Sequence, residues 1–219
     1  MRTNLLLIAA LATGCHAKFK KAVPYIDDIN VQVVTSGGPY VELGKIYSSV
    51  ETGDQGANLL ADIAVAAVNI SQDVKGINQT ERIANAVDIQ DVNAYMAMGL
   101  ADTLGGGPPF AYTESDADAT LQLEVLSYGV SVPYLGAPGE FTYSVNARMY
   151  TAAGERVYRK GLTCTVGLGN PEAAAVVFGT VNNIKQLDEM TDAEINDAFR
   201  NAAAWCGQRF VLKMRQHAG

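Results

Sequence analysis

The stretches ATLQLEVLSYGV (residues 119–130) and FTYSVNARMYT (residues 141–151) decide the fold class, because apolar and polar side chains alternate along both. This alternation places apolar side chains on one face of a strand and polar side chains on the other. TAAGER (151–156) follows as a turn and leads into RVYRKGLTCTVGL (156–168), where apolar residues alternate again. The three segments predict a small sheet with an antiparallel three-stranded meander, each strand burying one face.

Helical patterns lie on both sides of this meander. The segment 81–104 keeps apolar residues at helical spacing, with an expected break near Asp88, and GGGPP (105–109) ends it. A last helix begins at Thr191, because Glu194 completes a capping box. The order of elements indicates an α+β fold with helices packed on one face of the sheet. The other predicted elements are a strand at 30–36, a buried helix at 57–70 and a helix that starts at Asn170 and Pro171.

The N-terminus has the layout of a secretory signal, with one positive charge at Arg2 and an apolar stretch over residues 5–12. Thr13 and Gly14 are small residues that directly precede Cys15. The run 11–15 resembles the bacterial lipoprotein signal, and the resemblance implies that residues 1–14 are removed and that Cys15 is acylated. The chain would then be held to a membrane by an N-terminal lipid anchor. The alternative is a secreted protein in which the cysteine is incidental.

The residue after the cysteine bears on the destination of such a lipoprotein. His16 is not the aspartate that resembles an inner-membrane retention signal. The resemblance therefore implies the bacterial outer membrane, with the domain facing the periplasm. Residues 15–29 are short, charged and interrupted by Pro24, so we expect a lipidated tether there, with lysines that attract anionic headgroups. Residues 30–219 are then expected to form a single periplasmic domain.

Two cysteines remain after Cys15, in a chain that the signal resemblance implies is exported to an oxidising compartment. Cys164 falls on the face of its strand that is expected to be buried. Cys206 falls on the apolar stripe of the last helix, which also includes Ile195, Phe199 and Phe210. We therefore expect a disulfide between Cys164 and Cys206, and the alternative is two buried free thiols.

The composition gives little support to catalysis or to nucleic-acid binding. The chain has 16 Lys and Arg, 23 Asp and Glu, and a formal net charge of −7, which argues against a nucleic-acid partner. Its histidines, His16 and His217, lie near the two ends, so neither a catalytic triad, a metal site nor a cofactor is expected. Glu114, Asp116 and Asp118 form the best acidic cluster, which is either a calcium site without the full ligand set of an EF-hand or a solvated strand entrance. An enzyme built on Asp116 and Asp118 is the third alternative.

A second apolar set interrupts the simple alternation of the first strand. By strict alternation, Leu126, Tyr128 and Val130 fall on the face opposite Leu121, and Tyr134 and Leu135 follow in the hairpin loop. Such residues predict either a second packed layer or an exposed surface that binds a partner. We take these five residues as the candidate partner surface.

The segments ADATLQLEVLSYGV and FTYSVNARMYTAAGERVYRKGLTC resemble the strand pattern of small periplasmic domains in bacterial envelope lipoproteins. These include penicillin-binding-protein activators, curli-secretion lipoproteins, auxiliary lipoproteins of ABC transporters and the N-terminal domain of TolB. The resemblance implies a non-enzymatic assembly or transport accessory that acts through protein contacts with an envelope partner, and it is compatible with a homo-oligomer. The alternative is a lipoprotein that binds a lipid or other apolar ligand between the sheet and the helix around 63–68.

Overall fold

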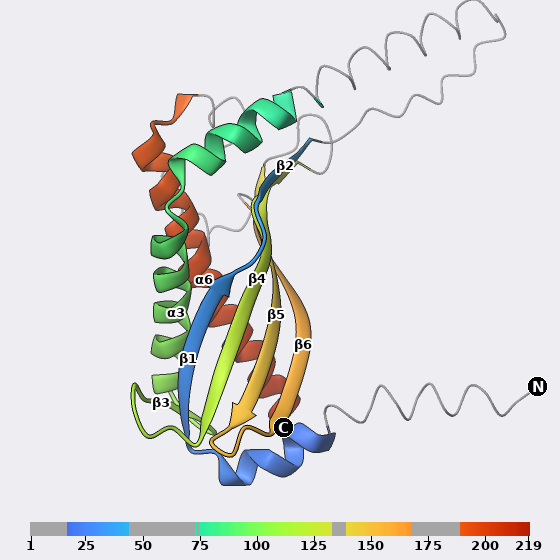
Figure 1. The fold of residues 1–219 in the computed structure, drawn as a ribbon, viewed down its shortest axis with the longest axis vertical. Helices are drawn as coiled ribbons and strands as arrows, with labels where there is room; N and C mark the ends of the chain where they lie inside the picture. Colours follow the sequence, from blue (N-terminus) through green and yellow to red (C-terminus); the bar gives the residue numbers. More distant parts are fainter. Residues whose placement is uncertain (1–16, 44–72, 74, 133–138, 168–188) are drawn as a thin grey trace, which may run out of the picture.

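The structure is a computed structural model, and it describes residues 17–43, 73, 75–132, 139–167 and 189–219. Its strands form one six-stranded sheet in the order β3-β1-β4-β5-β6, with β2 paired to β4 beyond the end of β1. Figure 1 shows α3 and α6 together on one face of this sheet. The fold is therefore α+β, as the alternating segments predict. The strands are β1 (Asp28–Thr35), β2 (Pro39–Leu43), β3 (Ala111–Tyr112), β4 (Ala119–Val132), β5 (Glu140–Thr151) and β6 (Arg156–Gly167).

The predicted meander is present, but it is part of a mixed sheet. β4, β5 and β6 pair antiparallel in chain order, whereas β1 and β2 both pair parallel to β4. The chain passes through α3 between β2 and β4, and a crossover of this kind returns a strand parallel to its neighbour. The sequence showed the first strand without indicating its partner, so the parallel part of the sheet was not expected.

A β-bulge in β4 changes which face its second half presents. The pairing with β5 shifts between Val125 and Ser127, so that Leu126 is an extra residue without an opposite partner. Beyond the bulge, Tyr128 pairs with Tyr143, and Val130 pairs with Phe141 on the buried face. The expectation that Tyr128 and Val130 lie opposite Leu121 and Leu123 is therefore wrong, because one inserted residue returns them to the same face.

The neighbouring strand is interrupted at the same level as the bulge. β1 ends at Thr35 and β2 begins at Pro39, and the backbone N–H groups of Ser36 and Gly37 both donate to the carbonyl oxygen of Val125. A Cβ atom at Gly37 would lie 1.5 Å from the carbonyl oxygen of Leu126, so only glycine allows this close approach. Gly37 thus lies between two strands that share β4 as their partner.

The helices α3 (Ile89–Gly105) and α6 (Asp192–Ala218) cover the buried face of the sheet. The predicted break is confirmed, since Asp88 caps α3 by accepting a hydrogen bond from the backbone N–H of Gln90. The predicted capping box is also confirmed, with Thr191 and Glu194 at the start of α6. The two helices cross closely, because a Cβ atom at Gly99 would lie 2.0 Å from the carbonyl oxygen of Ala204.

Residues 17–29 are folded, which corrects the expected tether over residues 15–29 in the part that the structure describes. Residues 17–22 are helical and continue into a 3-10 turn, η1 (Val23–Tyr25), and then into β1. Phe19 is fully buried, with its ring centroid 4.7 Å from that of Tyr158 and 6.0 Å from that of Phe110. Lys18 pairs with Glu155 at 2.8 Å, and Lys20 donates to the carbonyl oxygen of Gly219. The domain therefore includes the segment from Ala17 onward, because aromatic packing holds it to the end of the sheet.

Replacing Phe19 with alanine tests this packing. We expect Phe19→Ala to lower the free energy of unfolding by about 3 to 5 kcal/mol, because it empties a site between two aromatic rings. Urea unfolding followed by circular dichroism measures the change. Tyr25→Ala is the matched control, since Tyr25 is 82% exposed in the same segment and should change stability by less than about 0.5 kcal/mol. Equal effects of the two substitutions would contradict this packing and would support the expected tether instead.

Candidate functional site

The structure describes three of the five residues of the candidate partner surface. Tyr134 and Leu135, like Cys15, lie outside the described residues. Leu126 is 41% exposed at the bulge, but Tyr128 and Val130 belong to the core. These five residues therefore do not form one described surface.

Tyr128 is one member of an aromatic cluster between the sheet and α6. Its ring stacks near that of Tyr143 with centroids 6.4 Å apart, and it meets Phe199 edge-on at 5.8 Å. Phe141 meets the same phenylalanine at 4.8 Å. The Tyr143 hydroxyl donates a 2.7 Å hydrogen bond to the carbonyl oxygen of Phe199, and burial raises the pKa of Tyr143 well above its usual value. This cluster is structural, since its rings belong to the buried core and the hydroxyl of Tyr143 is satisfied inside it.

Cys164 of β6 and Cys206 of α6 form a disulfide, as the sequence predicts. The two half-cystines are buried, and they join the last strand of the sheet to the middle of the helix that covers it. The bridge closes a separation of 42 residues. It therefore holds α6 at a set distance from the outer strand.

The acidic cluster before β4 has a structural role at Asp118. Its Oδ2 atom accepts hydrogen bonds from the backbone N–H groups of Asp27 and Asp28, at 2.9 and 3.1 Å. These two bonds lower the pKa of Asp118, so the carboxylate stays ionised and is a poor general acid. Asp116 lies in the turn with a positive φ of 54°. The cluster thus fastens the start of β1 to the start of β4.

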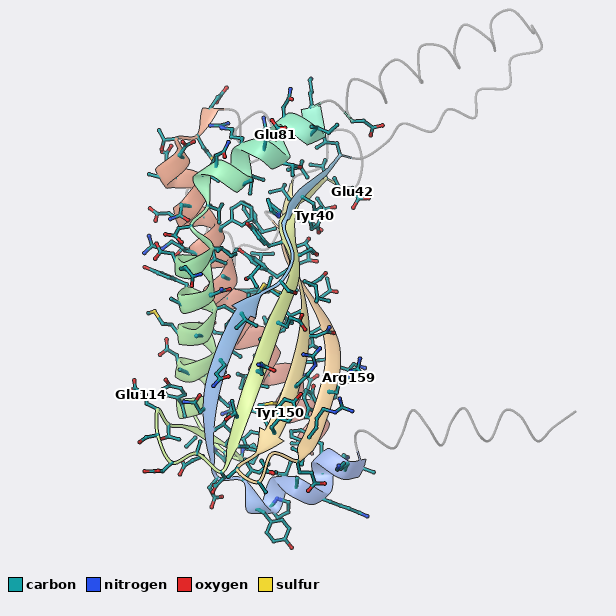
Figure 2. The ribbon with its side chains drawn as sticks, viewed as in Figure 1. Tyr40, Glu42, Glu81, Glu114, Tyr150 and Arg159 are labelled. Atoms are coloured by element: carbon teal, nitrogen blue, oxygen red, sulfur yellow. A yellow bond between two sulfur atoms is a disulfide. The ribbon has the colours of Figure 1, made fainter. Side chains whose placement is uncertain are left out.

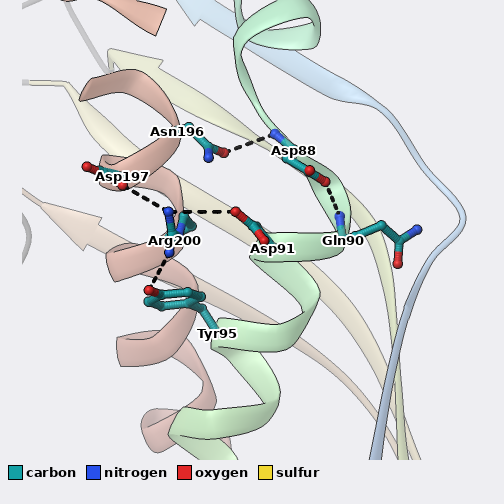
Figure 3. A network of polar contacts seen from close by, with 7 residues as sticks. All are labelled: Asp88, Gln90, Asp91, Tyr95, Asn196, Asp197 and Arg200. Atoms are coloured by element: carbon teal, nitrogen blue, oxygen red, sulfur yellow. Dashed lines mark hydrogen bonds and ion pairs between the residues drawn. The ribbon is translucent and has the colours of Figure 1, made fainter. Parts of the chain in front are cut away.

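A polar network joins the N-terminal ends of α3 and α6 (Figure 3). Arg200 of α6 donates to the hydroxyl of Tyr95 and lies over its ring, 4.2 Å from the centroid. The same guanidinium pairs with Asp197 at 3.1 Å and with Asp91 at 3.6 Å. Asn196 accepts a hydrogen bond from the backbone N–H of Asp88. Because every charged group here faces a partner within the network, we assign it to helix packing.

A groove of about 540 Å³ lies between β6 and α6. Its basic side chains are Lys160 on the strand and Arg209 and Lys213 on the helix, and none of the described residues that line it is acidic. Trp205 forms part of its wall, with the guanidinium of Arg209 4.7 Å from the ring centroid. The groove is therefore positively charged in a chain whose net charge is −7.

The sequence carried a signal for this groove that the prediction missed. Trp205, Arg209 and Lys213 recur at intervals of four residues, so they lie along one side of α6. Lys160 shares the inward alternation of Leu162 and Cys164 on β6. Periodicity places each set on one side of its own element. It does not show that β6 and this side of α6 lie next to each other, so the groove could not be predicted.

A second hollow of about 510 Å³ lies at the end of the sheet, beside the N-terminal segment. Its charged side chains largely satisfy one another or the backbone. Lys18 pairs with Glu155, and Asp118 accepts two backbone hydrogen bonds. This hollow offers less uncompensated charge than the groove beside β6.

His217 is the described histidine, and it belongs to the packing of α6 on β6. Its Nδ1 atom lies 2.8 Å from the hydroxyl of Tyr158, whose pKa is raised to about 12 by burial. Among the described residues, no group of three or more His, Cys, Asp or Glu side chains is placed to hold a metal ion. No helix in the described part of the chain combines the length and the apolarity needed to cross a membrane.

The α+β fold, the inter-layer disulfide and the basic groove were compared with known proteins. No family model matches the chain, and no significant match is found among curated protein sequences. Protein XCC0632 from Xanthomonas campestris, which carries the family description DUF330, is similar at 9% identity, covering 87% of this chain and 86% of its own, with a TM-score of 0.38.

Two further similar structures are lipoproteins by description. One, from Caulobacter crescentus CB15, is assigned as a lipoprotein and has 19% identity, 58% and 84% coverage of this chain and its own, and a TM-score of 0.34. Lipoprotein GNA1162 from Neisseria meningitidis has 18% identity, 75% and 99% coverage, and a TM-score of 0.23. At these identities and TM-scores the likenesses carry no argument about what this chain does.

Proposed function

We propose that this chain is an outer-membrane lipoprotein of the bacterial envelope, anchored through Cys15, that acts as a non-enzymatic assembly or transport accessory through protein contacts. The observation that carries the proposal is the folded N-terminal segment. Phe19 is fully buried four residues after Cys15. A lipid on Cys15 therefore holds the domain directly at the membrane surface, where a partner within or beside that membrane is in reach.

Two placements support the non-enzymatic part of the proposal. The carboxylate of Asp118 is engaged by backbone N–H groups, and the Nδ1 atom of His217 is engaged by Tyr158. General acid–base catalysis needs such a group within hydrogen-bond reach of a substrate. The uncompensated charge lies instead in the groove between β6 and α6, which is an open surface suited to contact.

The apolar-ligand function gains less support from the described residues. Aromatic and aliphatic side chains fill the layer between the sheet and the helices α3 and α6, and many are fully buried. The helix expected around 63–68, which was to form one wall of the pocket, lies outside the described residues. We therefore keep protein contact as the proposed function.

Replacing Cys15 with serine tests the anchor. We expect Cys15→Ser to move the protein from the membrane fraction to the soluble fraction, because no acyl chain can then be attached. Intact-mass analysis of the wild-type protein should show fatty acyl groups on Cys15. His16→Asp is the companion variant, and it should move the protein from the outer to the inner membrane on a density gradient.

The control for this experiment is the thermal melt of the released protein. It should equal that of the detergent-extracted wild type, since the described contacts that hold the N-terminal segment come from Lys18, Phe19 and Lys20 and not from residue 15. A wild-type mass without acyl groups, or a Cys15→Ser protein that stays with the membranes, would overturn the anchor.

A further inference from the structure

The outer edge of β6 presents backbone groups that no described strand pairs. β6 lies at the end of the sheet order, with β5 as its neighbour on one side. In an antiparallel pair, alternate residues direct their N–H and C=O groups away from the partner strand. Such an edge is a template for one more strand.

The groove beside β6 adds chemical selectivity to this edge. Gly161, Thr163 and Thr165 of the strand line it together with Lys160. Opposite them, α6 contributes Trp205, Arg209, Lys213 and the 43% exposed Leu212. Neither Lys160 nor Lys213 has an ion-pair partner among the described residues. A strand added here would therefore place one set of its side chains against cations and an aromatic ring.

We propose that the groove between β6 and α6 binds an extended acidic segment of a partner protein, which adds to the sheet as a strand beside β6. Backbone hydrogen bonds to the edge give affinity, and carboxylates that meet Lys160, Arg209 and Lys213 give selectivity. Apolar side chains of the same segment pack on Trp205 and Leu212. The Cys164–Cys206 disulfide keeps the groove open at a set width by holding α6 beside the strand.

A second copy of this chain fits the edge less well. β6 carries Arg156, Arg159 and Lys160, and two copies paired through this strand would bring like charges together. Like charges across paired strands are destabilising, and basic side chains on an edge strand discourage such pairing. The charge of the groove thus selects an acidic partner over self-association.

This inference deepens the proposed function, because it names the chemistry of the protein partner. It rests on that function only for the claim that the chain acts by contact. Binding at the groove is measured on the purified mature chain in detergent. The result therefore does not depend on whether the chain is anchored to a membrane. Membrane release by Cys15→Ser reports on the anchor, and the experiment below reports on the groove.

The probe is a synthetic peptide of alternating aspartate and valine, about eight residues long, which spans a typical strand. Trp205 is the one tryptophan of the chain, so its fluorescence reports from the groove itself. We expect the peptide to change this fluorescence in a saturable manner, and binding to weaken about tenfold or more when salt is raised to about 1 M. A lysine–valine peptide of the same length should not bind.

Two double variants distinguish binding at the groove from an effect of the net charge of the protein. Lys160→Glu with Lys213→Glu should weaken binding by about tenfold or more, since two contacts with carboxylates become repulsive. Arg156→Glu with Arg159→Glu makes the same change in net charge, with both substitutions on β6, but these side chains do not line the groove. Figure 2 shows Arg159 on the side of the sheet that faces away from α6. This control should bind nearly as well as the wild type.

The backbone contribution has its own test. A peptide methylated on alternate backbone nitrogens, on the side that faces β6, cannot donate to the strand and should lose binding. Hydrogen exchange of the outer β6 amides should be fast in the free protein and slow with the unmodified peptide. Protection of these amides in the free protein would overturn the proposal, because the edge would already be covered. Equal binding of the methylated peptide, or of the two double variants, would also overturn it.

Discussion

Tyr128→Asp should unfold the domain or lower its free energy of unfolding by more than about 4 kcal/mol, a loss that only a few mechanisms produce. Tyr128 is 5% exposed and is packed against Tyr143 and Phe199. Aspartate would remove the ring from this cluster and bury a carboxylate without a charged partner. Such a loss is a large fraction of the roughly 5 to 15 kcal/mol that stabilises a domain. Thermal and urea unfolding followed by circular dichroism measure it.

Leu126→Asp is the matched control for this prediction. The same residue is introduced two positions earlier on the same strand, but Leu126 is 41% exposed at the bulge. We expect a change in stability of less than about 0.5 kcal/mol. If β4 alternated without a bulge, the two positions would share one face and the two substitutions would have similar effects. A mild Tyr128→Asp variant would therefore contradict the burial of Tyr128.

Removing the disulfide is the second large effect. Cys164→Ala with Cys206→Ala opens a loop with a separation of 42 residues, and the chain-entropy model gives a loss of about 4 kcal/mol. For a chain of this size, the melting temperature should fall by about 8 to 16 °C. Differential scanning calorimetry of the oxidised wild type and the double variant measures the difference.

Reduced wild-type protein is the control for the disulfide prediction. Its cysteine side chains remain in place, so it loses the cross-link without losing side-chain volume, and its melting temperature should fall close to that of the double variant. Thiol counting under denaturing, non-reducing conditions should find neither Cys164 nor Cys206 free. A reduced protein that melts with the oxidised one would show that the bridge adds no stability.

Local pattern determined several elements of this protein correctly. The capping box of Thr191 and Glu194, the helix break at Asp88 and the antiparallel order of β4, β5 and β6 all depend on residues close together in the chain. Capping, helical periodicity and strand alternation are local effects, so they can be read from a single sequence. The pairing of Cys164 with Cys206 was also accessible, since each had already been placed on an apolar face and the resemblance assigned Cys15 to the lipid anchor.

Tertiary structure alone decided the remaining features, because each depends on segments far apart in the chain. The bulge at Leu126 is coupled to the strand break at Gly37, and alternation along β4 does not reveal an inserted residue. The sequence predicts Phe19 to be part of a charged tether, because its contacts with Phe110 and Tyr158 come from distant segments. The basic groove exists only once β6 and α6 lie side by side. The sequence determined the meander, the helix starts and the disulfide, whereas long-range packing decided which faces are buried and which surface stays exposed.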